Sequence, residues 1–172
     1  TEGFAELGTD KAFQNAHENP TLVDSVRIGK MIKYPVAEEA GANAYFVAAP
    51  ERETKEYLLL LHEWWGLNEN IKREADYWAK LLNINVIALD LYDGKVGTTP
   101  EEATALMQAN NEARTRAIIQ GAFDFADVDG DDDLDVLVTG TSLGGNFDPI
   151  STLYENDGAG NFTEFSGSSF NG

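Results

Sequence analysis

Five aspartates with alternate spacing form the strongest chemical pattern in this 172-residue chain. Dense negative charge of this kind is unfavourable unless a cation joins it. Ca²⁺ binds roughly six to eight oxygens and accepts more protein carboxylates than Mg²⁺ does. The spacing therefore predicts a Ca²⁺ site in which Asp133 contributes its backbone carbonyl, and the alternative is a solvated acidic turn. The five candidate ligands are Asp127, Asp129, Asp131, Asp133 and Asp135.

A second pattern is typical of nucleophilic catalysis. The segment GTSLGG, residues 140–145, satisfies G-x-S-x-G-G directly after the apolar stretch DVLVT, as a nucleophile elbow does. In this interpretation Ser142 attacks a carbonyl carbon, and the N–H groups of Leu143 and Trp64 hold the oxyanion. An elbow should lead into a helix, however, whereas Pro149 and strand-forming residues follow, and no histidine lies downstream to act as a base. A loop between two strands is therefore the favoured alternative for this serine.

The third group of chemistry-bearing residues lies in HEWWGLN, residues 62–68. It follows a short apolar run from Tyr57, which predicts a strand buried on both faces of a parallel sheet. Ligands bind beyond the carboxyl ends of such strands, so this loop and residues 90–95, after the next predicted strand, should line any site. The alternative is that Glu63 is a loop carboxylate and the two tryptophans cap the core.

The elements that must position these loops are predicted by hydrophobic periodicity. Partial alternation over residues 25–34 and 42–49, around a glycine-containing turn, predicts a β-hairpin. Apolar residues at helical spacing over 71–82 predict a helix. The apolar run over 85–91 predicts a second buried strand, so the strand–helix–strand unit should be a right-handed parallel crossover.

A further helical region follows the second strand. Thr99 and Pro100 predict a helix start, with Thr99 as the N-cap and Glu102 reaching back to the amide of that cap residue. We expect helix to about Gln120, broken into two pieces at Asn110–Asn111 because asparagine competes for backbone hydrogen bonds.

The stretch HEWWGLNENIKREADYWAKLLNINVIALDLYDGKVGTTPEEATALMQ resembles the dienelactone hydrolase family, α/β-hydrolase-fold enzymes that open lactones and esters. The resemblance covers roughly residues 28–122. It implies that Glu63 contacts the nucleophile and that the Trp64 backbone N–H helps to form the oxyanion hole, where one donor lowers the barrier by about 3–4 kcal/mol. The chain departs from the family pattern because it has no cysteine to serve as the usual nucleophile and no histidine after His62.

Residues 121–166 resemble one blade of an FG-GAP/VCBS-type β-propeller, on the segments FADVDGDDDLDVLVTG and ISTLYENDGAGNFTEF. The resemblance implies that the five aspartates form the calcium loop between the first two strands of a blade, although Asp132 stands where the repeat usually has glycine. Residues 156–161 predict a turn between strands at 150–155 and 162–165. A propeller has about four to eight blades, so one blade is incomplete as a fold. The resemblance to secreted and surface proteins favours an extracytoplasmic location.

The distribution of charge supports two segments that meet at about Gly121. Residues 1–120 contain 19 acids and all 12 bases, whereas residues 121–172 contain 11 acids and no base. The net charge of −18 disfavours nucleic acids and anionic membrane surfaces as partners, and no apolar run approaches the roughly 20 residues of a membrane span.

We therefore expect an α/β chain, in which residues 1–120 form a partial α/β-hydrolase with a parallel sheet and flanking helices, and residues 121–172 form a short all-β segment like one propeller blade. Two functions follow from the candidate residues. One is hydrolysis of a small ester or lactone by Ser142, Glu63 and Trp64, and the other is a calcium-binding structural or interaction module. A partial sheet also leaves exposed strand edges that favour homo-oligomers.

Overall fold

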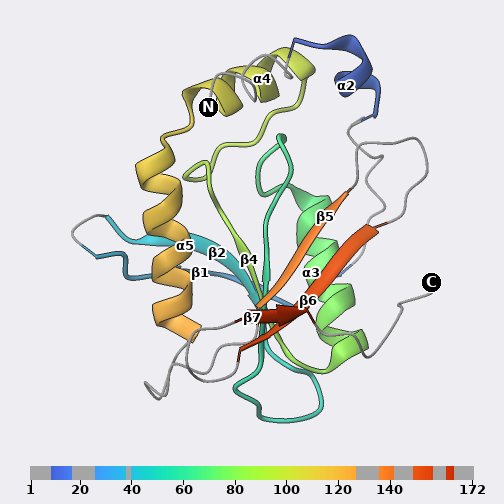
Figure 1. Ribbon diagram of the computed structural model, residues 1–172, viewed down its shortest axis with the longest axis vertical. Helices are drawn as coiled ribbons and strands as arrows, with labels where there is room; N and C mark the ends of the chain where they lie inside the picture. Colours follow the sequence, from blue (N-terminus) through green and yellow to red (C-terminus); the bar gives the residue numbers. More distant parts are fainter. Residues whose placement is uncertain are drawn as a thin grey trace.

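The centre of the computed structural model is a four-stranded sheet with a long helix on each face (Figure 1). The structure describes residues 9–16, 26–37, 40–126, 136–141, 149–156 and 162–164. The strands lie in the order β1-β2-β4-β3. Their bounds are β1 Lys30–Tyr34, β2 Ala42–Val47, β3 Tyr57–Leu60 and β4 Asn85–Leu89. The helices are α2 Lys11–Ala16, α3 Glu69–Leu82, α4 Pro100–Ala109 and α5 Glu112–Ala126. The chain is thus a mixed α/β protein.

The strand pairing confirms the predicted hairpin and the predicted parallel pairing of the strand–helix–strand unit. β1 and β2 pair antiparallel, with Ile32 opposite Ala44. β3 and β4 pair in parallel, with Leu58 opposite Val86, and α3 connects them. The sheet as a whole is mixed, however, because β2 also pairs antiparallel with β4.

Both faces of the central strands are buried, which explains their continuous apolar sequence. Toward α5, Leu59 of β3 and Ile87 of β4 pack with Ile118 of the helix. Toward α3, Leu58 and Val86 pack against the other face. Successive strand residues point to opposite faces, so a run such as YLLL must be apolar at every position to fill both layers. The α3 side is completed by Leu60, Ala75, Ala79 and Ala88.

Helix α3 begins two residues before the predicted start because Asn68 caps it. The Asn68 side-chain oxygen accepts hydrogen bonds from the backbone N–H groups of Asn70 (3.0 Å) and Ile71 (3.2 Å). These bonds satisfy two of the amides that a helix leaves open at its first turn. The helix ends at Leu82, and its C-cap Asn83 adopts the left-handed conformation with φ 55°.

The start of α4 confirms Thr99 as the N-cap, and Glu102 reaches back to the cap and to the residue before it. The Thr99 hydroxyl oxygen accepts from the Glu102 N–H at 3.3 Å. The Glu102 carboxylate accepts from the N–H (2.8 Å) and hydroxyl (2.6 Å) of Thr98, with a further backbone bond from Thr99. A threonine before the cap offers two donors to one carboxylate, and these hydrogen bonds lower the pKa of Glu102.

The helical region breaks at Asn110–Asn111, as predicted, and the second piece runs beyond the predicted end. Asn111 accepts from the Arg114 N–H at 3.1 Å and so caps α5. α5 continues past Gln120 to Ala126, because Ile118, Ala122 and Ala126 recur every four residues and are all buried against the sheet. Residues 121–126, which begin the stretch that resembles a propeller blade, therefore form the last turns of this helix.

A second, three-stranded antiparallel sheet contains β5 Val136–Thr141, β6 Pro149–Asn156 and β7 Phe162–Glu164 in sequential order. β5 pairs with β6 and β6 with β7, which confirms the strands predicted for this region. β5 lies alongside β3 of the central sheet (Figure 1). The predicted turn, the five aspartates from Asp127 to Asp135 and Ser142 all lie outside the described residues.

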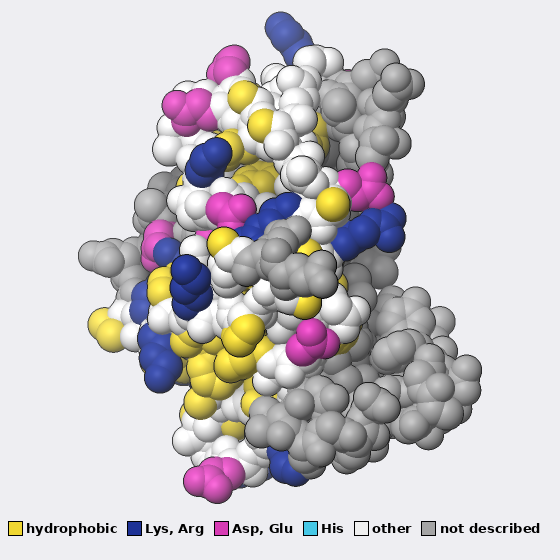
Figure 2. Space-filling model, turned by 90° about the vertical axis from the view of Figure 1, so that its left-hand side faces the viewer, with side chains coloured by type: hydrophobic (Ala, Val, Ile, Leu, Met, Phe, Trp, Pro, Cys, Tyr) yellow, Lys and Arg dark blue, Asp and Glu magenta, His cyan; other side chains and the backbone are white. Residues whose placement is uncertain are grey.

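The outer edge of the central sheet is basic. β1 is an edge strand, and Lys30 and Lys33 are both exposed on it. Figure 2, which views the face that carries α5 and the β1–β2 hairpin, shows Lys and Arg side chains interspersed with Asp and Glu. Lysine on an edge strand opposes pairing with another sheet. Among the helices described, none is long and apolar enough to cross a lipid bilayer.

Candidate active site

The loops that follow β3 and β4 meet at the carboxyl edge of the parallel strand pair. The β3 loop covers residues 62–68 and the β4 loop residues 90–97. They are joined by a backbone hydrogen bond in which Gly97 N–H donates to the Trp65 carbonyl at 2.9 Å. Because the two strands are parallel, both loops leave the same edge of the sheet, which is where α/β proteins bind ligands.

His62 connects the two loops through both of its ring nitrogens. Its Nε2 lies 3.1 Å from the backbone N–H of Leu91, and its Nδ1 lies 2.6 Å from the Glu63 carbonyl oxygen. The ring packs edge-on against Tyr92, with centroids 4.6 Å apart. Burial lowers the pKa of His62, which favours the neutral ring near neutral pH.

The two tryptophans of the β3 loop pack beneath helix α4. Trp64 is 5% exposed and Trp65 is 3% exposed, and their rings lie 4.7 Å apart. They form a small cluster with Ala103 and Met107 of α4. Their side chains therefore cap the core, as the alternative interpretation of the sequence predicts, and α4 holds the loop against the sheet.

Glu63 lies between these two anchors. Its side chain is half-buried. Its backbone carbonyl oxygen accepts a second hydrogen bond, from Gly66 N–H at 3.1 Å, in addition to the contact with His62. The peptide that joins Glu63 to Trp64 is consequently fixed by its own loop.

The β4 loop is organised by a buried carboxylate. Asp90 is 2% exposed and accepts from the backbone N–H of Tyr92 at 3.3 Å, with a further backbone bond from Gly94. Burial raises the pKa of Asp90, while these two N–H donors lower it. The loop turns through Asp93 and Gly94, which both have positive φ.

Arg114 of α5 anchors the same loop from outside. Its guanidinium donates to Asp93 at 2.8 Å and to the Ala40 carbonyl at 2.7 Å, with a longer bond to Gly41 at 3.3 Å. One side chain thus ties the β4 loop and the end of the β1–β2 turn to the helix. The sequence analysis identified residues 90–95 but not this arginine, whose partners are 21 and 74 residues away in sequence.

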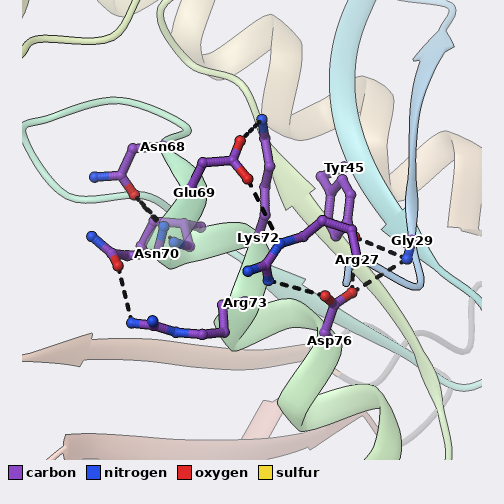
Figure 3. A network of polar contacts seen from close by, with 10 residues as sticks. Arg27, Gly29, Tyr45, Asn68, Glu69, Asn70, Lys72, Arg73 and Asp76 are labelled. Atoms are coloured by element: carbon purple, nitrogen blue, oxygen red, sulfur yellow. Dashed lines mark hydrogen bonds and ion pairs between the residues drawn. The ribbon is translucent and has the colours of Figure 1, made fainter. Parts of the chain in front are cut away.

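A second polar cluster lies on the other side of the sheet, where α3 faces β2 (Figure 3). Asp76 is 5% exposed and accepts from the Tyr45 hydroxyl at 2.8 Å, from Arg27 at 3.1 Å and from Gly29 N–H at 3.3 Å. Burial, followed by the hydrogen bond to Asp76, raises the pKa of Tyr45 to about 12. Sequence reasoning missed this cluster. The one sequence feature that points to it is Asp76, an acid directly beside the apolar position Ala75 of the predicted helix.

Of the predicted site residues, the structure describes two, Glu63 and Trp64. Glu63 and Trp64 are neighbours in the β3 loop, at the predicted edge of the sheet. Ser142 follows the last residue of β5 and, like the five aspartates, is outside the described ranges. Within the described ranges, no three His, Asp or Glu side chains come together as a metal site.

Comparison with known proteins adds no family assignment. A scan against models of protein families finds no match to the chain, and a search of curated proteins finds none either.

Proposed function

We propose that the chain is a dienelactone hydrolase-like α/β hydrolase that cleaves a small ester or lactone. One observation carries the proposal: the peptide between Glu63 and Trp64 is held in a fixed loop at the carboxyl edge of a parallel strand pair. In α/β hydrolases an N–H from the loop between the third strand and the following helix supplies part of the oxyanion hole. The Trp64 amide belongs to the equivalent loop here, between β3 and α3.

In this proposal Ser142 is the nucleophile. It follows β5, the strand that lies alongside β3. The serine oxygen bonds to the carbonyl carbon, its proton passes to the Glu63 carboxylate, and the N–H groups of Trp64 and Leu143 stabilise the oxyanion. The C–O bond to the leaving oxygen then breaks, and the protonated Glu63 gives its proton to that oxygen, which becomes an alcohol. The resulting acyl-serine is hydrolysed by water, whose proton passes through Glu63 back to the serine oxygen. Two features lead us to expect slow turnover. A carboxylate is a weak base for a serine hydroxyl. A nucleophile elbow normally opens a helix, whereas the next described element after Ser142 is the strand β6.

The experiment that tests this mechanism measures hydrolysis of p-nitrophenyl acetate and dihydrocoumarin by the whole chain. The variants are Ser142→Ala and Glu63→Gln, with Ser151→Ala as the matched control. We expect hydrolysis above the uncatalysed rate, its loss in Ser142→Ala, a decrease of about a hundredfold in Glu63→Gln, and no change in Ser151→Ala. Equal rates for the original chain and Ser142→Ala would exclude Ser142 as the nucleophile.

A second candidate, a calcium-binding module of FG-GAP/VCBS type, is favoured by the antiparallel order β5-β6-β7. The acidic segment 127–135 directly precedes β5, so a bound cation would neutralise charge next to the sheet. A ligand that binds only the folded state raises its stability. The thermal midpoint should therefore rise in millimolar CaCl₂ relative to chelator, and Asp129→Ala should abolish this rise. An unchanged midpoint in CaCl₂ would reject the module.

A further inference from the structure

We propose that His62 is a positioning residue: a neutral imidazole with its proton on Nδ1, which joins the β3 and β4 loops and aims the Trp64 amide. Its two contacts are the Leu91 N–H at Nε2 (3.1 Å) and the Glu63 carbonyl oxygen at Nδ1 (2.6 Å). The first partner lies in the β4 loop and the second in the β3 loop, so a single ring spans both.

The chemistry of the partners fixes the tautomer. A backbone N–H can only donate, so Nε2 must present its lone pair to Leu91. A carbonyl oxygen can only accept, so Nδ1 must carry the proton that it donates to Glu63. The other neutral tautomer would place two donors against each other at Leu91 and two acceptors against each other at Glu63. The imidazolium would keep the bond to Glu63 and lose the bond to Leu91.

The contact at Nδ1 also sets the direction of the neighbouring amide. The Glu63 carbonyl and the Trp64 N–H belong to the same peptide plane, and in a trans peptide they point in opposite directions. No cis peptide occurs among the described residues. The Glu63 oxygen is held by His62 and by Gly66 N–H at 3.1 Å, so the Trp64 N–H is directed away from both donors. The catalytic value of this orientation rests on the proposed hydrolase function, whereas the orientation itself does not.

The surroundings of the ring support its neutral state. The titratable groups that act on or contact it are Asp90 from the end of β4 and Tyr92 from the β4 loop, and Glu63 contacts it through its backbone carbonyl. Burial lowers the pKa of His62, and the hydrogen bond to the Glu63 carbonyl and the charge of Asp90 only partly oppose this. A histidine with a lowered folded-state pKa contributes stability that is complete above its ordinary value of 6.5 and is lost as the pH falls through the folded-state value.

The first experiment determines the tautomer directly. The chain has two histidines, so His17→Gln leaves His62 as the single imidazole. Long-range ¹H–¹⁵N spectra of this variant, labelled with ¹⁵N-histidine, should show the Nδ1–H form near neutral pH. On acidification the Leu91 amide resonance should shift with the same midpoint as the ring. The Nε2–H form, or a protonated ring near neutral pH, would overturn the proposal.

The second experiment compares His62→Phe with His62→Asn. Phenylalanine keeps a ring against Tyr92 and loses both hydrogen bonds, whereas asparagine keeps a donor close to Nδ1. Amide exchange at Leu91 should become at least about fivefold faster in both variants, and exchange at Gly66 should accelerate only in His62→Phe. Unchanged exchange at Leu91 would refute the contact.

The tautomer and exchange measurements involve no substrate, so they stand if the hydrolase proposal fails. If the chain is active, His62→Phe should lower kcat with KM unchanged, since the oxyanion forms only after substrate has bound. A change confined to KM would refute the positioning of the Trp64 amide while leaving the hydrolase proposal intact.

Discussion

Two glycines in the loops of the candidate site offer a matched test of how tightly these loops are packed. Gly66 has φ +90° and Gly94 has φ +88°, so an alanine at either position meets the same backbone penalty. Their surroundings differ. A Cβ at Gly66 would lie 2.5 Å from the Lys95 carbonyl oxygen, whereas a Cβ at Gly94 would have no atom within 4 Å. Gly94→Ala thus measures the backbone penalty alone, and Gly66→Ala measures that penalty plus the steric overlap.

The expected magnitudes follow from these distances. A left-handed backbone costs an L-residue about 1–2 kcal/mol, and the reduced entropy of the unfolded chain returns about 0.4–1 kcal/mol. Gly94→Ala should therefore destabilise the fold by about 0.5–1 kcal/mol. At Gly66 the obstacle is backbone rather than a flexible side chain, so the β4 loop must move, and overpacking of this kind costs a further ~1–3 kcal/mol. The total for Gly66→Ala is about 1.5–4 kcal/mol.

The assay is urea denaturation near neutral pH, followed by far-ultraviolet circular dichroism and by tryptophan fluorescence. The fluorescence reports on the loops because Trp64 and Trp65 belong to the β3 loop. Equal m-values for the three proteins would show that the variants unfold from the same structure. If Gly66→Ala and Gly94→Ala destabilise the chain equally, the close contact between the β3 loop and Lys95 does not exist and the reasoning is refuted.

Three further predictions concern the polar cluster and the sheet edge. Asp76→Asn should lower the free energy of unfolding by about 2–3 kcal/mol, because it removes the charge that faces a largely buried Arg27. A decrease in this free energy of less than about 0.5 kcal/mol, as is usual at surface sites, would contradict the hydrogen-bond network around Asp76. The raised pKa of Tyr45 stabilises the fold below pH 10, and this contribution is lost as the pH rises through about 12. Stability measured across this alkaline range should therefore fall less steeply in Tyr45→Phe, and identical slopes would argue against the contribution. Replacement of Lys30 and Lys33 by threonine should increase self-association, measured by sedimentation velocity, since β1 is an edge strand. If the double variant stays monomeric at every concentration, charge does not protect this edge.

The central α/β unit could be predicted from the sequence because each of its elements has a periodic pattern with one physical meaning. The apolar run from Tyr57 requires burial on two faces, and the helical spacing from Ile71 to Leu82 requires burial on one. These patterns are local and depend only on whether a side chain faces the core. The start of α3 was misplaced because a cap depends on a single polar side chain, Asn68, and not on periodicity.

The end of α5 contains a glycine whose role local sequence does not show. Gly121 coincides with the change in charge composition at the predicted boundary between two segments, and it lies within helix α5. A Cβ at this position would lie 2.7 Å from the Pro35 carbonyl oxygen and 3.1 Å from Val36. The glycine is therefore required where the helix approaches the end of β1, and its role depends on a tertiary contact that local sequence cannot show.

The polar contacts of the site were the least predictable part for the same reason. Asp76 meets Tyr45 across 31 residues and Arg27 across 49, and Arg114 meets Ala40 across 74. Which charged side chain meets which buried acceptor is decided by the packing of α3 and α5 on opposite faces of the sheet. A single acid beside an apolar helix position indicates that a partner is needed but does not identify it.

The two interpretations of HEWWGLN, a catalytic loop or a core cap, are compatible because they concern different atoms of the same residues. The indole rings of Trp64 and Trp65 are buried beneath Ala103 and Met107, which is a structural role. The proposed role in catalysis belongs to the backbone amide of Trp64, and an oxyanion donor is effective only if it is held in place before the reaction begins. Burial of the indoles, the bond from His62 to the Glu63 carbonyl and the Gly97–Trp65 backbone bond all restrict that amide. The same features that make the tryptophans part of the core are therefore those that a preorganised oxyanion site requires.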